Sequence, residues 1–257
     1  MKSGAESLET DVAIVGAGGG GAVLGLALAR KGIRTLVLEQ ASGPPTGLRG
    51  EILQPNGQRV LDQLGLLGSL PSNAARPVRL FHFCRVGGER LCTVDYGTLP
   101  PPYNRAVVTL PNVAHHAILQ ALESRVPGGL RYGTTFKQLV RAEGRDHVVG
   151  LEAECEGKPL TVSAKLVVGA DGALSKVREA LAIPAKLHRY SEGYLIAILD
   201  RPEGLEEARY FVGRHAILGV FPAAGDKAYL FYMIPSGSLP QIKAAGLQAL
   251  RERWLAI

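Results

Sequence analysis

The stretch DVAIVGAGGGGAVLGLALARKGIRTLVLE, residues 11–39, decides how this chain folds. The apolar run Val12–Val15 is rich in β-branched residues and predicts a buried strand. Gly16–Gly21 follows it and fits the pattern G-x-G-x-x-G, after which the Ala- and Leu-rich run Ala22–Arg30 predicts a helix. Ile33–Leu38 predicts a second strand. The sequence therefore predicts a strand–turn–helix–strand unit of the kind that binds dinucleotides.

The glycines of this unit each have a predicted task. Gly16 permits the tight turn, Gly18 lets a pyrophosphate approach the backbone, and Gly21 lets the helix pack closely on the strand. Gly19 and Gly20 open the helix, where free N–H groups and the positive end of the helix dipole favour a phosphate. We assign all five glycines to a cofactor site.

The carboxylate of Glu39 marks the far end of this site. Glu39 follows Gly16 by about 20 residues and ends the second predicted strand, where a carboxylate accepts both hydroxyls of an adenosine ribose. A 2′-phosphate would be repelled there, so the sequence disfavours NADP at this site.

Two other readings of the glycine-rich stretch are weaker. Val12–Ala29 holds no charge and is about as long as a transmembrane span. It contains six glycines, however, and Arg30-Lys31 follows at once, so strand, turn and helix explain it better and we expect no stable membrane insertion. A flexible glycine-rich linker would not have such dense apolar flanks.

Composition limits the remaining function classes. A chain of 257 residues with 46% hydrophobic and 20% charged residues has enough apolar material for one large domain or two small ones. The net charge of +6 is spread along the sequence without a basic patch interleaved with aromatics, which argues against nucleic-acid binding. A mild attraction for anionic cofactors is the simpler interpretation.

The cysteines, histidines and N-terminus indicate a cytoplasmic protein without a metal. Three cysteines without a C-x-x-C pair favour a reducing compartment. The neighbours His115 and His116 would point to different sides of a helix, so no metal site is expected. The first ten residues are polar and do not resemble a signal peptide.

The rest of the chain alternates between helical and strand patterns. Val60, Leu61 and Leu64 have helical spacing, Pro111 predicts the first residue of another helix, and Leu239–Ile257 is amphipathic. Predicted strands cover residues 79–84, 90–96, 106–110, 130–132, 136–142, 147–155, 160–164, 165–169, 194–199, 208–212, 216–221 and 228–234. Residues 136–164 predict a three-stranded antiparallel meander.

A second candidate motif is Asp171-Gly172, between a predicted buried strand, Lys165–Gly169, and a short helix. A small residue there allows close approach of the backbone, and the carboxylate can hold a hydroxyl or a water at a helix start. A plain turn with a helix-capping Asp is the alternative.

Three separated motifs together resemble the flavin-dependent aromatic hydroxylases, which are typified by para-hydroxybenzoate hydroxylase and have squalene epoxidase as a relative. The first motif is the glycine turn with Glu39, and the last is Asp171-Gly172 with Ser175 and Arg178. Between them, the run from Arg49 to Pro55 resembles the Gly-Glu-x-Leu-Gln-Pro segment of squalene epoxidases. The resemblance covers residues 10 to about 240 in order.

This resemblance implies an FAD-dependent monooxygenase. It implies NADH or NADPH as a transient reductant, O₂ as co-substrate, and a small aromatic or hydrophobic substrate that a flavin C4a-hydroperoxide hydroxylates. The implied FAD contacts are Gly16, Gly18, Gly19, Gly20, Gly21, Glu39, Gln40, Arg49, Leu139, Asp171 and Gly172. Arg178 is a candidate to meet the nicotinamide cofactor, and no catalytic base is assigned.

Two departures from the family pattern bear on activity. Pro111 occupies the place of an Arg or Gln that touches the flavin in relatives. The third flavin motif, a Gly-Asp segment, is missing, because Gly225-Asp226 predicts a hairpin turn between strands. We therefore expect a chain that is truncated at its C-terminal end.

The expected fold class is α/β, with a Rossmann-type FAD-binding layer and an inserted, mostly antiparallel substrate sheet. We expect an FAD-binding domain formed by residues 1–75 and 105–185, and a substrate-binding sheet domain formed by residues 76–104 and 186–257. The candidate substrate wall contains Phe81, Phe83, Phe221 and Tyr232, although aromatic residues in a sheet are more often core.

Two alternative functions remain open at this point. A flavin-dependent reductase or dehydrogenase could use the same scaffold. A truncated, non-catalytic flavin-binding protein is the other alternative, because the third flavin motif is missing.

Overall fold

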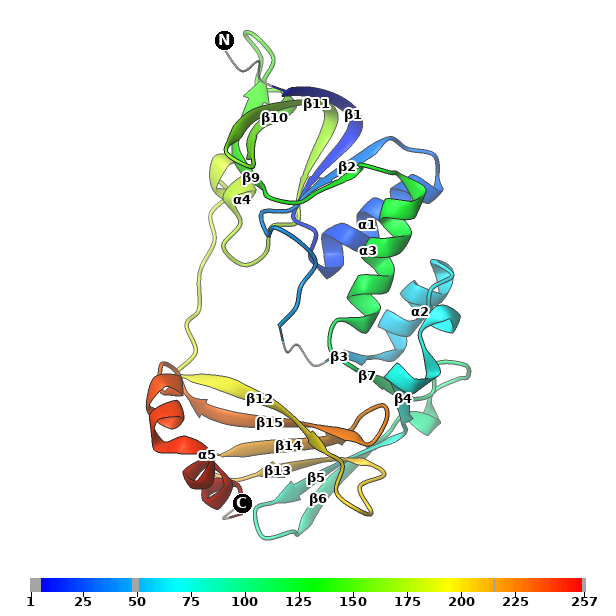
Figure 1. The fold of residues 1–257 in the computed structure, drawn as a ribbon, viewed down its shortest axis with the longest axis vertical. Coiled ribbons are helices and arrows are strands. Elements are labelled where there is room, and N and C mark those ends of the chain that lie inside the picture. Colours follow the sequence, from blue (N-terminus) through cyan, green and yellow to red (C-terminus); the bar gives the residue numbers. More distant parts are fainter. Residues whose placement is uncertain (1–5, 48–50, 215, 256–257) are drawn as a thin grey trace. The chain divides into compact units, whose positions relative to one another are not determined.

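A computed structural model describes residues 6–47, 51–214 and 216–255 (Figure 1). The chain forms two compact units, each built from two separate stretches. They are Met1–Thr46 with Ala114–Lys186, and Gly47–Val113 with Leu187–Ile257.

The unit boundaries lie near residues 46 and 114, not at the sequence-based positions 75 and 105. The reason is a small three-stranded sheet, in the order β3-β7-β4, that belongs to the second unit. Its strands are β3 (Glu51–Leu53), β4 (Ala75–Val78) and β7 (Ala106–Thr109). The assignment of one unit to FAD and the other to a substrate stays a prediction.

A six-stranded sheet forms the centre of the first unit, in the order β8-β2-β1-β11-β10-β9 (Figure 1). The strands β8, β2, β1 and β11 run parallel, and β11 also begins an antiparallel meander with β10 and β9, as the α/β fold class predicts. The strands are β1 (Glu6–Val15), β2 (Thr35–Leu38), β8 (Leu130–Arg131), β9 (Thr134–Arg141), β10 (Val148–Cys155) and β11 (Lys158–Gly169). The helices are α1 (Gly19–Arg30), α3 (Val113–Arg125, which starts at the unit boundary) and α4 (Lys176–Ala180).

Helix α1 lies close to the sheet because Gly25 has no side chain. A Cβ at Gly25 would stand 2.7 Å from Val37 Cγ2 of β2 and 3.4 Å from Leu122 Cδ2 of α3. Ile14 and Val37, in the middle of the parallel strands, are fully buried. Burial on both faces is the normal condition of parallel strands and explains their apolar runs.

A charge cluster of Asp11, Arg34 and Lys165 lies near the middle of β1 and β11. Asp11 of β1 accepts hydrogen bonds from Arg34 Nε at 3.2 Å and is 2.8 Å from Lys165 Nζ of β11. These two cations, Arg34 foremost, hold the pKa of Asp11 well below its usual range. The cluster ties the start of β2 and the middle of β11 to β1.

The prediction of a separate buried strand at residues 165–169 was wrong. Residues 158–169 form the single strand β11, which pairs with β1 along both halves. Its antiparallel pairing with β10 ends at Ser163, and the later half is more open: Leu160 is 1% exposed and Leu166 55%. Periodicity alone could not reveal this, since apolar residues occupy both halves.

The second unit is built on another six-stranded sheet, in the order β12-β15-β14-β13-β5-β6 (Figure 1). Neighbouring strands are antiparallel except β13 and β5, which are parallel. The strands are β5 (Leu80–Arg85), β6 (Arg90–Asp95), β12 (Glu192–Asp200), β13 (Ala208–Val212), β14 (Ile217–Pro222) and β15 (Lys227–Pro235). The helices are α2 (Pro55–Gln63), α5 (Leu239–Leu255) and three 3₁₀ turns at Leu67–Ser69, Ser72–Ala74 and Tyr96–Thr98.

The core of this unit is aromatic. Phe221 and Tyr229 are 1% and 0% exposed and pack with Phe81 and residues of the small sheet. Gly225, with φ 63°, turns the chain between β14 and β15, so the predicted hairpin turn is confirmed.

Helix α2 buries a polar residue in place of a predicted apolar one. Leu61 and Leu64 are buried as expected, but Val60 is 38% exposed and Gln58 only 3%. Gln58 Nε2 donates to the carbonyls of Leu53, at 2.8 Å, and Arg105, at 2.6 Å. These bonds remove the cost of burying the amide.

Two other helices differ from the sequence-based prediction. Helix α3 begins at Val113 and not at Pro111, because Asn112 has φ 60°, which no α-helical residue adopts. Helix α5 is broken at Gly246, where φ is 83°, and the last two residues of its predicted range lie outside the described residues.

The two halves of β11 provide a matched test of burial. We expect Leu160→Ala to lower the free energy of unfolding by about 2–5 kcal/mol, the usual cost of a core cavity. Leu166→Ala, the same change on the same strand, should alter it by less than about 0.5 kcal/mol. Urea denaturation followed by circular dichroism measures both, and equal losses would contradict the burial difference.

Candidate cofactor-binding site

Three parallel strands end at the same edge of the first sheet. Val15 at the end of β1 is in register with Leu38 of β2 and with Gly169 of β11. The glycine turn, Glu39 and the Asp171 turn follow these three residues directly. The carboxyl edge of a parallel sheet is where ligands bind in α/β folds, and the structure brings two of the three motifs together there, the glycine turn with Glu39 and the Asp171 turn.

Two glycines of the turn are required by contacts within the chain. Gly16 has φ 101°, and a Cβ there would lie 2.5 Å from the carbonyl oxygen of Ala170. A Cβ at Gly21 would lie 1.9 Å from the carbonyl oxygen of Gly16. The turn between β1 and α1 therefore packs directly on the chain after β11.

The three glycines between them are open. An added Cβ at Gly18, Gly19 or Gly20 would meet no described heavy atom within 4 Å. Gly18 precedes the first residue of α1, and the first turn of α1 holds no acidic residue. The first N–H groups of a helix have no partner within the helix, so this exposed N-terminus fits a pyrophosphate group.

Glu39 is half-buried and braces the glycine turn. Its Oε2 accepts a hydrogen bond from the N–H of Ala17 at 2.9 Å, and its Oε1 accepts one from Ala41 at 2.8 Å. A carboxylate has about four acceptor positions, so both oxygens can still accept ribose hydroxyls. Gln40 is exposed beside it.

Tyr132 lies close enough to Glu39 for the carboxylate charge to act on its hydroxyl group. Burial raises the pKa of Tyr132, and the negative charge of Glu39 adds to this rise. Nothing in the spacing of the sequence marks this tyrosine as part of the site.

His115 was also missed as a site residue. Its Nε2 is 2.8 Å from the carbonyl oxygen of Ala17, so this nitrogen carries the donated hydrogen. The Nε2 atom of His116 is 2.8 Å from the carbonyl oxygen of Pro45, so the two histidines face different partners, as predicted. The peptide groups on both sides of Ala17 are thus held, by Glu39 and by His115.

Asp171 accepts three hydrogen bonds at the start of helix α4. Its Oδ1 accepts from Ser175 Oγ at 2.6 Å, and its Oδ2 accepts from the N–H groups of Lys176 at 2.6 Å and Val177 at 3.2 Å. Burial would raise the pKa of Asp171, but these hydrogen bonds outweigh it and the pKa is lowered. The N-cap of α4 is Ser175, whose Oγ accepts from the N–H of Arg178 at 3.0 Å, and Asp171 supports this helix start from the preceding turn. A cofactor role of Asp171 and the exposed Gly172 stays a prediction.

The cofactor roles predicted for Arg49, Leu139 and Arg178 stay predictions. Arg49 lies outside the described residues. Leu139 pairs with Leu151 and packs on the core of the first unit. Arg178 Nη2 donates to the carbonyl of Ala173 at 2.8 Å, so its proposed nicotinamide contact stays a prediction.

The aromatic residues of the second unit divide between core and a half-buried group. Phe83 stacks on Tyr210 with ring centroids 4.8 Å apart, and Phe231 lies 5.1 Å from the buried Phe221. Tyr232 instead packs against Trp254 of α5, at 6.4 Å. Sequence reasoning missed Tyr210, whose pKa is raised chiefly by burial.

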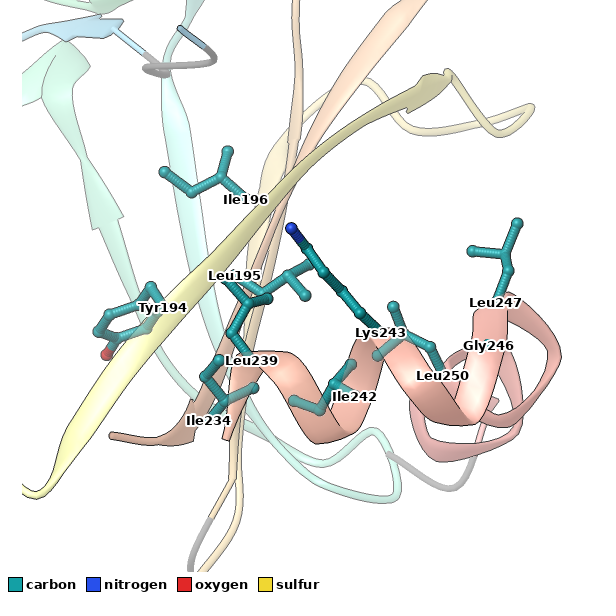
Figure 2. Close-up of a pocket in the computed structure, with 10 residues that line it drawn as sticks. All are labelled: Tyr194, Leu195, Ile196, Ile234, Leu239, Ile242, Lys243, Gly246, Leu247 and Leu250. Atoms are coloured by element: carbon teal, nitrogen blue, oxygen red, sulfur yellow. The ribbon is translucent and has the colours of Figure 1, made fainter. Parts of the chain in front are cut away.

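A pocket of about 610 Å³ also lies in the second unit, lined by residues of β12, β15 and α5 (Figure 2). Its walls are mostly apolar, and Lys243 contributes an amine. None of the predicted cofactor residues lines it, so it is not the candidate nucleotide site.

Two other kinds of site are absent from the described ranges. No group of three or more metal-ligating side chains occurs among residues 6–47, 51–214 and 216–255. No helix in the described part of the chain is long and apolar enough to cross a membrane.

Known proteins similar to this chain support a dinucleotide cofactor, as the geometry of the glycine turn does. A family model described as an FAD binding domain matches residues 9–236. The chain is 30% identical to 6-methylpretetramide 4-monooxygenase of Streptomyces rimosus, over 97% of this chain and 59% of that protein. It is 26% identical to squalene epoxidase of Schizosaccharomyces pombe, over 91% of this chain and 51% of that protein. The chain thus spans between half and three fifths of these two relatives.

A solved structure shares the fold of both units. PqsL of Pseudomonas aeruginosa, in complex with 2-aminobenzoylacetate, superimposes with a TM-score of 0.80 at 25% identity, over 96% of this chain and 67% of that one.

Two neighbouring glycines test the packing of the turn. We expect Gly21→Ala to unfold the chain or to lower its melting temperature by several degrees, because the new methyl group would overlap the carbonyl of Gly16. Gly20→Ala, on the same helical turn but in open space, should leave the melting temperature unchanged or slightly raised. Differential scanning calorimetry compares them; equal melting temperatures would refute the assigned contact.

The hydrogen bonds that Asp171 accepts at the start of α4 predict a pH dependence. Because its pKa is lowered on folding, its stabilising effect is present above the ordinary carboxyl pKa and is lost as the pH falls through the lowered value. We expect Asp171→Asn to cost about 1 kcal/mol at pH 7, as for loss of a helix cap, and progressively less towards pH 3. Urea denaturation of both proteins across this range measures the difference, and a cost independent of pH would contradict the assignment.

Proposed function

Because the chain belongs to the family of FAD binding domains, we propose that its first unit binds FAD and that it serves an FAD-dependent monooxygenase reaction. The observation that carries the proposal is the exposed N-terminus of α1, with open backbone at Gly18 and with Glu39 beside it. This arrangement combines an anion site with a ribose acceptor at one sheet edge.

The proposed cofactor contacts follow from this placement. The N–H groups at the start of α1 bind the pyrophosphate, and Glu39 with Gln40 holds the adenosine ribose. Asp171 and Gly172 lie at the end of the neighbouring strand and border the cofactor. Arg49 and Leu139 complete the set on the strength of the family resemblance.

FAD supplies the electron transfer and the oxygen chemistry when it is bound. The residues of the chain bind and orient it and exclude water from the reacting atoms. The proposed reductant is NADH or NADPH, and the co-substrate is O₂. The names of the two relatives support an aromatic or otherwise hydrophobic small molecule as substrate.

The half-buried aromatic group of the second unit supports the same substrate class. The stacked rings of Phe83 and Tyr210 and the nearby Phe231 offer flat apolar surface to a ring or an isoprenoid chain. The free thiols of Cys84, Cys92 and Cys155 support a reducing compartment, and we place the protein in the cytoplasm on that basis.

Flavin binding gives the first test. The purified chain should take up FAD and show a flavin absorbance spectrum. We expect Glu39→Ala to weaken FAD binding about tenfold or more, as for loss of hydrogen bonds to a charged group, because the ribose loses its acceptor. Glu143→Ala, which removes an exposed carboxylate from a turn of the same unit, is the charge-matched control. Quenching of flavin fluorescence measures both affinities; equal values would contradict the Glu39 contact.

The reaction itself is tested with ¹⁸O₂. A monooxygenase consumes NAD(P)H and O₂ and places one labelled oxygen atom in the product. Consumption of NAD(P)H with a reduced, unlabelled product would favour a flavin-dependent reductase. A colourless protein that takes up no FAD would favour a non-catalytic role.

A further inference from the structure

The backbone of the glycine turn is held at Ala17 from both sides. The N–H of Ala17 donates to Glu39 Oε2 at 2.9 Å, and its carbonyl oxygen accepts from His115 Nε2 at 2.8 Å. Ala17 itself is buried, at 3% exposure. These two contacts come from opposite parts of the unit, the tip of β2 and the first turn of α3.

The His115 contact fixes more than one atom. The carbonyl of Ala17 and the N–H of Gly18 belong to one planar, trans peptide group, in which the two bonds point in opposite directions. Holding the carbonyl towards α3 therefore directs the Gly18 N–H away from α3. Gly18 has φ −61° and ψ 179°, and no described heavy atom lies within 4 Å of its Cβ position.

Glycine makes such a clamp necessary. A peptide group next to a glycine rotates at little steric cost, so an unclamped Ala17–Gly18 peptide would populate other orientations. Each of them would turn the N–H away from an anion at the start of α1. Preorganised donors bind an anion more strongly because no ordering cost remains at the moment of binding.

We propose that His115 is a positioning residue for the cofactor: by holding the Ala17 carbonyl, it directs the Gly18 N–H to the pyrophosphate of the dinucleotide. This inference rests on the proposed binding of FAD at the glycine turn. It gives α3 a role in cofactor binding without any direct contact between its side chains and the cofactor.

Two side chains of similar length separate the hydrogen bond from the bulk of the ring. His115→Gln keeps an N–H donor, whereas His115→Met keeps the length and apolar volume but has none. We expect the methionine variant to bind FAD and ADP about tenfold more weakly, the order of one hydrogen bond to a charged group, and the glutamine variant to stay close to the wild type. Flavin fluorescence and calorimetric titration with ADP measure these affinities.

His116→Met is the matched control. His116 is the next residue of α3 and makes the same kind of bond, 2.8 Å to the carbonyl of Pro45. We expect its loss to lower the melting temperature without the tenfold loss of affinity. Equal weakening by both methionine variants, or a glutamine variant as weak as the methionine one, would overturn the inference.

The wild type separates this inference from the proposed function. A wild-type chain that binds neither FAD nor ADP overturns both. Tight binding by the wild type and by His115→Met alike overturns only the role of His115.

The amide signal of Gly18 gives a readout that does not depend on folding of the variants. In ¹⁵N-labelled wild-type protein, ADP should move the Gly18 amide proton downfield as it donates to the pyrophosphate. ADP binding that leaves this signal in place would overturn the inference as well.

Discussion

The parallel pairing of β1 with β2 on one side and β11 on the other is the constraint on which the first unit depends. It brings the glycine turn, Glu39 and the Asp171 turn to one sheet edge, although more than a hundred residues of sequence separate the first from the last. The same pairing sets Gly16 against Ala170, so closely that no side chain fits at Gly16. Position in the sheet, and not sequence proximity, makes this a single site.

The residues at this edge of the first sheet have different roles. Gly16 and Gly21 serve packing, whereas Gly18 to Gly20 present open backbone. The carboxylate of Asp171 accepts three hydrogen bonds at the start of α4, which favour its ionised form and fix its position. One rigid turn therefore lies beside one accessible helix end, an arrangement that suits an anionic ligand.

Local sequence patterns predicted the parts of this site that depend on neighbours in the chain. The glycine turn, the strand before it and the acid at the tip of β2 all follow from short-range spacing, and the structure contains each of them. His115 could not be found in this way, because its contact with Ala17 joins residues 98 positions apart. A histidine on a helix carries no signal of the carbonyl that it will meet.

The wrong predictions of which residues are buried also arise from contacts with distant parts of the chain. Gln58 is buried because its amide donates to two carbonyls, one of them 47 residues away, and these hydrogen bonds offset the cost of burying a polar group. Leu166 is exposed in the part of β11 that lies beyond its pairing with β10. Each outcome is decided by a distant segment, so periodicity alone assigned the wrong residue to the interior.

The partnership of β1 and β11 has a consequence for the order of events during synthesis. The ribosome makes Glu6–Val15 before its partner Lys158–Gly169, which is synthesised about 150 residues later. At about 5–20 residues per second, the first strand waits on the order of ten seconds for this neighbour. The edge of β1 that pairs with β11 lacks its partner throughout that interval, and an unpaired strand edge is the feature of a nascent chain that favours aggregation.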